Sequence, residues 1–144
     1  MTSILDEIVP KLRRAVGDTK EPYSYADSIL VEYIEDAVDG LYLDWRHDYV
    51  IDRDNNTIEP DVNKAHQILI AMKAKLDMLE SKSDISFRSG SLSVTRKSDD
   101  KKRLSKKIDS VINNLKLLEG VMTYGSELTD FANRLENWFY IETL

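Results

Sequence analysis

The fold of this chain is decided by the stretch from Tyr23 to Trp45, which reads YSYADSILVEYIEDAVDGLYLDW. Its apolar side chains recur at the three- and four-residue spacing of one helix face; they are Ile29, Leu30, Tyr33, Ile34, Ala37, Val38, Leu41 and Tyr42. The opposite face carries carboxylates, as a solvated surface does: Glu32, Glu35, Asp36 and Asp39. Ser24 or Asp27 can cap the first turn, because a short side-chain oxygen accepts a hydrogen bond from a free backbone N–H there. The pattern predicts an amphipathic helix that carries no catalytic chemistry.

Helical spacing also flanks this stretch on both sides. It predicts helices over residues 3–16, 61–81 and 97–119, and a C-terminal helix and tail over about 126–144. Pro10 should kink the first helix, and Gly17 should end it. The fold class predicted is therefore mainly α: a bundle of four to five helices with one small β-hairpin, in a single domain over residues 1–144.

The hairpin is predicted at about residues 84–96, DISFRSGSLSVTR, where the apolar period changes from 3.6 to 2. Ile85 and Phe87 alternate with polar residues before a Ser-Gly turn, and Leu92 and Val94 alternate after it. A lone two-stranded hairpin is marginal in water, so it needs the helices or another chain to pack on. Phe87, Arg88 and Leu92 are therefore candidate interface residues.

The net charge of −6 is unevenly distributed along the chain. Residues 1–81 sum to −8, residues 82–107 to +6 and residues 108–144 to −4. A chain with acidic ends and a basic middle can attract copies of itself, an acidic partner or nucleic acid. There is no cysteine, hence no disulfide, and no apolar run is long enough to span a bilayer. We therefore expect a soluble protein that is not exported by the usual route.

The strongest charge feature is the basic segment of residues 96–107, which includes Lys101, Lys102 and Arg103. One interpretation is a phosphate-binding stripe at the start of a helix. No aromatic residue interleaves with it, however, and two aspartates interrupt it. A solvated helix face or a protein-contact patch is the favoured interpretation.

No motif predicts a catalytic or metal site. The loop Asp52–Asn56 imitates the first ligands of a calcium-binding EF-hand, but Thr57 stands where glycine is needed and Asn63 where a bidentate glutamate should close the site. A solvated turn is the better interpretation. His47 and His66 lie in different elements without zinc-ligand spacing, and His66 is expected on the polar edge of its helix. We predict no cofactor, no metal, no catalytic residue and no enzymatic activity.

The C-terminus crowds five large apolar residues into a short segment: Trp138, Phe139, Tyr140, Ile141 and Leu144. Together they cover more than one helical stripe, so some should stay exposed. Exposed aromatic clusters often mark partner sites. Two roles stay open, docking into a partner and closure of the helical bundle.

In element order over roughly residues 1–118, the chain resembles the head–tail connector proteins of tailed bacteriophages, also called adaptor or head-completion proteins. The family typically shows Tyr-x-Tyr/Trp-Ser/Ala-Asp leading into a helix of the form LLxYINDAVxDL, and here residues 23–41 read YSYADSILVEYIEDAVDGL. A strand pair of the form ISYKSGDxSIS often follows, and here residues 85–94 read ISFRSGSLSV. Asp39–Gly40 departs from the family pattern.

The resemblance implies a structural virion protein of the neck, assembled in the host cytoplasm. It implies a homo-oligomeric ring, such as a dodecamer, that binds beneath the portal protein, extends the DNA channel and seats the stopper or tail-completion protein. DNA would pass through without sequence-specific binding. The alternative function from the residues alone is a small helical nucleic-acid-binding protein that uses segment 96–107; a third is a host protein-interaction bundle.

Overall fold

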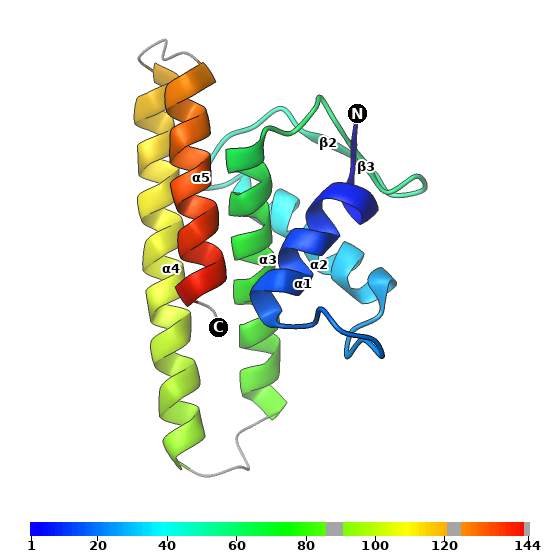
Figure 1. The fold of residues 1–144 in the computed structure, drawn as a ribbon, viewed down its shortest axis with the longest axis vertical. Helices are drawn as coiled ribbons and strands as arrows, with labels where there is room; N and C mark the ends of the chain where they lie inside the picture. The colour runs from blue at the N-terminus through cyan, green and yellow to red at the C-terminus, as the bar shows by residue number, and fades with distance from the viewer. Residues whose placement is uncertain (86–90, 121–124, 143–144) are drawn as a thin grey trace.

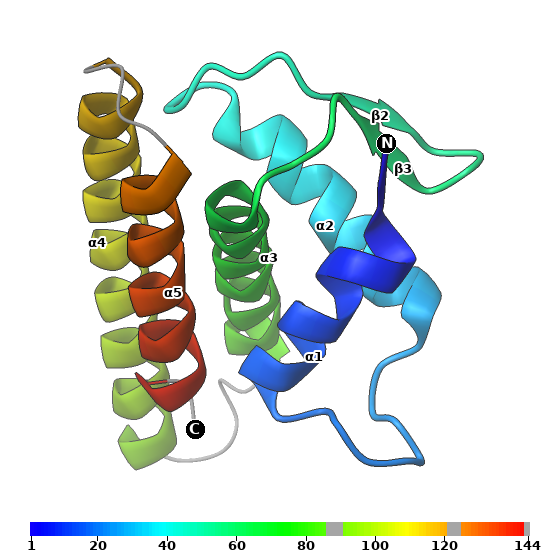
Figure 2. The ribbon, with the colours of Figure 1, turned by 45° about the horizontal axis from the view of Figure 1, so that its top comes forward.

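One helix, α3 (Lys64–Ile85), forms the centre of the fold. In the computed structural model, which describes residues 1–85, 91–120 and 125–142, α1 (Val9–Val16) and α2 (Asp27–Leu41) lie on one side of α3. The helices α4 (Ser91–Gly120) and α5 (Gly125–Glu142) lie on the other side (Figures 1 and 2). The predicted fold class, a mainly α bundle of four to five helices, is confirmed, and the small β element is a three-stranded sheet.

The central place of α3 explains its composition. Five consecutive residues, Ile68 to Met72, are fully buried, so the helix is covered on nearly all sides rather than along the single stripe that was predicted. The helix begins at Lys64, not at Asp61, because the Asn63 side chain accepts a hydrogen bond from the backbone N–H of His66 at 2.9 Å.

Helix α2 forms where predicted, but its buried face is rotated. Val31 and Glu35 are buried while Ile29 and Tyr42 are exposed. Neither Ser24 nor Asp27 caps it, because Ala26 occupies the N-cap position and no side-chain cap hydrogen bond forms there. Glu35, predicted to be solvated, instead accepts a hydrogen bond from Arg53 at 2.6 Å. The reason is that the loop around Arg53 folds back over α2.

The first predicted helix is divided in two. A π-helical turn, η1 (Ile4–Ile8), precedes α1, and the change of helix type falls just before Pro10. Ser3 caps η1 as expected by accepting from the Asp6 N–H at 3.2 Å, and Glu7 accepts from the Ser3 N–H at 3.0 Å. Gly17 ends α1 with φ of 76°, the left-handed conformation expected of a terminating glycine.

The β-sheet lies elsewhere than predicted. Strands β1 (Thr2–Ser3), β3 (Thr57–Glu59) and β2 (Val50–Asp52) form an antiparallel sheet in that order, with Ile58 opposite both Thr2 and Ile51. The predicted polar turn after Asp52 joins β2 to β3: the Asp52 carboxylate accepts from the N–H groups of Asp54 and Asn55 at 3.1 and 3.3 Å. Hydrogen bonds from Asn55 hold the pKa of Asp52 below its usual value.

The predicted hairpin at 84–96 is wrong where the structure describes it. Residues 84–85 end α3 and residues 91–96 begin α4, while residues 86–90 lie outside the described residues. Extending an existing helix adds one hydrogen bond per residue, whereas an isolated two-stranded hairpin has little to pack on. Helix therefore replaces strand in this segment.

Candidate interaction surface

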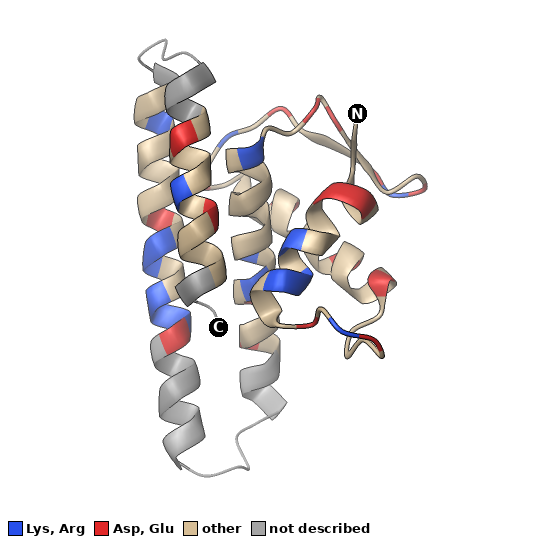
Figure 3. Cartoon of the chain, in the orientation of Figure 1, with Lys and Arg blue, Asp and Glu red and all other residues tan. Residues whose placement is uncertain are grey.

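Three of the described basic residues in the segment 101–107 of α4 point away from the core. The apolar side of the helix packs in the core through Leu104, Ile108, Val111, Ile112 and Leu115. Lys102, Arg103 and Lys106 are therefore exposed, while Lys101 and Lys107 are partly buried; Figure 3 shows this group along α4. Arg103 pairs with Asp100 at 2.6 Å on the helix surface, an exposed pair of small energetic value.

The C-terminal aromatic residues are divided among three environments. Phe139 is fully buried, so it closes the core, one of the two roles considered from sequence. The Trp138 ring lies 4.9 Å from the Lys107 ammonium, and the Tyr140 ring lies 4.2 Å from the Arg14 guanidinium. Burial, and to a lesser extent the nearby Glu136, raise the pKa of Tyr140. Trp138 and Tyr140 thus attach α5 to α4 and α1.

A groove of about 270 Å³ opens between α4 and α5, next to this cluster. Its lining combines apolar groups with two cations and one amide: Lys107, Val111, Asn114, Phe131, Arg134 and Leu135. Val111 and Leu135 are buried at its floor, whereas Arg134 and Asn114 are exposed. This arrangement suits a ligand that presents an apolar group beside a carboxylate or another anion.

The candidate residues chosen from sequence are only partly brought together. Lys107 of the basic segment and Trp138 of the C-terminal cluster are in contact. Leu92 lies in α4 and Ile141 in α5, while Phe87, Arg88 and Leu144 lie outside the described residues. The groove residues on α5 were not predicted; a signal did exist, since Phe131 and Arg134 are three residues apart on one helix face.

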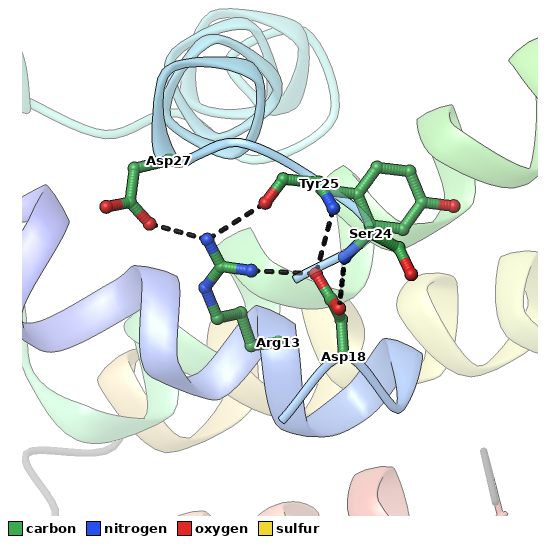
Figure 4. Close-up of polar contacts among 5 residues, drawn as sticks. All are labelled: Arg13, Asp18, Ser24, Tyr25 and Asp27. Atoms are coloured by element: carbon green, nitrogen blue, oxygen red, sulfur yellow. Dashed lines mark hydrogen bonds and ion pairs between the residues drawn. The ribbon is translucent and has the colours of Figure 1, made fainter. Parts of the chain in front are cut away.

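A second unpredicted feature is the polar clasp at the start of α2, shown in Figure 4. Buried Arg13 donates to Asp18 at 2.7 Å, to the Tyr25 carbonyl at 3.0 Å and to Asp27 at 2.5 Å. Asp18 in turn accepts from the backbone N–H groups of Ser24 and Tyr25 at 2.7 and 3.1 Å. The Arg13 guanidinium also lies 4.0 Å from the Tyr23 ring centre. These contacts fix the segment before α2 onto α1.

The two histidines meet around Trp45, which the sequence did not predict. The rings of His47 and His66 lie 5.2 and 4.5 Å from that of Trp45. The Tyr49 hydroxyl is 2.6 Å from His66 Nδ1, and His47 Nε2 donates to the Val38 carbonyl at 2.8 Å. His66 is buried, so its predicted place on a polar helix edge is wrong. Within the described ranges, no three His, Asp or Glu side chains are grouped to hold a metal ion.

In the part of the chain that the structure describes, no helix combines the length and apolar character needed to cross a membrane. Comparison with protein-family models, with curated protein sequences and with solved structures finds no match.

Proposed function

We propose that this chain is a structural connector subunit that joins the head to the tail of a bacteriophage. The observation that carries the proposal is the polar clasp. Tyr23, Tyr25 and Asp27, which open the stretch that resembles the connector family, all contact Arg13. Their pattern is therefore explained by a defined structural role, the attachment of α2 to α1.

The proposal rests on the N-terminal half and not on the strand pair that the family often shows. Residues 91–94, which match the second strand of that pair, are helical in this chain. The support is thus the clasp and the α2 helix, together with a groove between α4 and α5 whose lining combines cations with apolar groups.

In this function the protein acts by shape and interface energy. Copies form a ring beneath the portal protein in the virion neck, extend the DNA channel and seat the stopper or tail-completion protein. The N-terminal body, from β1 to α3, would set the geometry of the ring, and side chains on α4 and α5 would contact neighbouring subunits.

Electron microscopy with the portal protein of the same phage tests the proposal. We expect a ring of extra density at one end of the portal when this protein is added, and none with the portal alone. A variant of this protein, Asp18→Ala, weakens the clasp and should lower the fraction of portals that carry a ring. Failure to co-elute with the portal, together with unchanged portal particles, would contradict the connector function.

A second function, nucleic-acid binding, is favoured by one observation, the exposed Lys102 and Lys106 on the same stretch of α4. Phosphate contacts predict binding that falls steeply as salt rises. Electrophoretic mobility shifts with short duplex DNA, measured at low and moderate salt, test it. Binding that disappears in Lys102→Glu/Lys106→Glu would favour this function over the connector.

A further inference from the structure

The outer face of α2 is an uncovered surface with both charge and apolar groups. Helix α3 and η1–α1 cover its opposite side. Ile29 is 44% exposed and Leu43, just beyond the helix, is 89% exposed. Glu32 and Asp36 lie between them on the same face, one turn apart. Neither carboxylate makes an ion pair with another described residue, and both help raise the pKa of Glu35, after the larger effect of its burial.

This face has the complementary chemistry to the groove between α4 and α5. The groove places Lys107 and Arg134 around an apolar floor that includes Phe131. The α2 face places Glu32 and Asp36 beside Ile29. An isoleucine over the floor would bring carboxylates toward the two cations, so apolar burial and charge pairing would act together.

The two surfaces cannot meet within one chain. Helix α2 packs on one side of α3, and α4 and α5 lie on the other side (Figure 2). The contact must therefore join two copies, and it is heterologous because each copy contributes a different surface. Repeated contacts of this kind close into a ring or extend into a filament.

We propose that the groove between α4 and α5 binds the outer face of α2 from a second copy of this chain. The proposal deepens the connector function, on which it rests, by assigning the contact between neighbouring subunits. Two variants of the full chain test it. The first reverses the helix face, Glu32→Lys/Asp36→Lys, and the second reverses the groove, Lys107→Glu/Arg134→Glu.

Sedimentation velocity measures self-association at protein concentrations up to about 1 mM, where even weak complexes are populated. We expect the wild-type chain to associate, and to associate less at high salt because exposed charges are screened. Each variant alone should associate at least about tenfold more weakly, since like charges then face each other. Mixing the two variants in equal amounts should restore association, because every contact again joins opposite charges.

A matched control reverses two exposed lysines outside the groove, Lys20→Glu/Lys116→Glu, and should associate as the wild type does apart from a small general charge effect. Circular dichroism checks that every variant keeps its helical content. A wild-type chain that stays monomeric, or reversed chains that associate as well as the wild type, would overturn the proposal. A mixture that fails to recover would also overturn it. Ring formation on the portal that is unaffected by either reversal would reject this contact while leaving the connector function standing.

Discussion

The N-terminal body, from β1 to α3, and the α4–α5 pair are stabilised in different ways. Buried and partly buried polar contacts stabilise the N-terminal body: the Arg13 clasp, the Arg53–Glu35 pair and the Thr2 hydroxyl, which accepts from the Val62 N–H at 2.8 Å. Such contacts are directional, so they specify one arrangement of the helices.

The α4–α5 pair attaches to the rest mainly through apolar side chains. Leu104, Ile108 and Phe139 lie in the same core as the α3 residues. The polar links described here are at the surface, such as Lys64 with Asn133 at 2.8 Å and with Glu136 at 3.4 Å. Apolar contacts supply stability without fixing direction as strictly. Directional contacts therefore fix the N-terminal body, whereas apolar packing is the main attachment of the α4–α5 pair.

The largest expected effect comes from breaking the attachment of α5. Phe139→Ala removes a fully buried ring and should lower the free energy of unfolding by about 3–5 kcal/mol, because a cavity replaces lost contacts. Urea denaturation followed by circular dichroism measures the change. Trp138→Ala, at a partly buried position, is the matched control and should cost less. Equal losses at the two positions would contradict the division of the cluster into a core residue and a surface residue.

Breaking the polar clasp should have the next largest effect. Among the described residues, Asp18→Ala leaves buried Arg13 with Asp27 as its one charged partner, and it removes the acceptor for two backbone N–H groups. We expect a loss of about 2–4 kcal/mol, as for other broken buried pairs. Asp27→Ala, whose carboxylate is 60% exposed, serves as the control and should cost about 1 kcal/mol or less. Hydrogen exchange should rise first in residues 18–26 of the Asp18 variant; uniform exchange across the chain would count against a local clasp.

The two regions also differ in how much of their structure the sequence could predict. Helix positions were predictable because the apolar period of α2 and α3 is long and regular, and Gly17 ends α1 for the expected conformational reason. The rotation of the buried face of α2 was not predictable. It places Glu35 in a buried position, where the carboxylate accepts a hydrogen bond at 2.6 Å from Arg53, a residue of a later turn. The place of the sheet was missed because three-residue strands carry little periodic signal.

The candidate site was predictable only in composition. The basic segment and the aromatic cluster were visible in the sequence, but their contact through Lys107 and Trp138 depends on how α4 and α5 pair. The clasp likewise joins Arg13 to Asp27 across a loop, which local patterns cannot reveal. Such pairs join residues that are far apart in the sequence, so their partners become known only from the structure.

Lys75 lies where the N-terminal body meets the α4–α5 pair, and it should make the stability of this contact depend on pH. Its ammonium donates to the Ala15 carbonyl at 3.1 Å and lies 6.0 Å from the Phe139 ring, and burial lowers its pKa from 10.5 to about 8. Above pH 8 the unfolded chain therefore binds a proton that the folded chain has released, so stability rises with pH. We expect a gain of about 1–2 kcal/mol between about pH 7.5 and pH 9.5.

Urea denaturation at both pH values measures this gain. Lys75→Met keeps the apolar stem without the charge, so its stability should lack the rise attributed to Lys75 and should exceed that of the wild type at the lower pH. A wild-type rise that persists unchanged in Lys75→Met would assign the titration to another group.

The smallest expected effect concerns the turn that folds over α2. Arg53 is about half exposed, so Arg53→Ala should cost only about 0.5–1 kcal/mol at neutral pH. Burial already raises the pKa of Glu35, and loss of Arg53 should raise it further, because Arg53 favours the ionised carboxylate. The cost of Arg53→Ala should therefore be present above the pKa of Glu35 in the variant and shrink as acid protonates that carboxyl in both proteins. Chemical denaturation at several pH values follows the change.

In a Glu35→Gln background the Arg53 substitution should cost less at neutral pH. An equal cost in both backgrounds would show that Arg53 stabilises the turn through Asp39, its other partner at 2.9 Å.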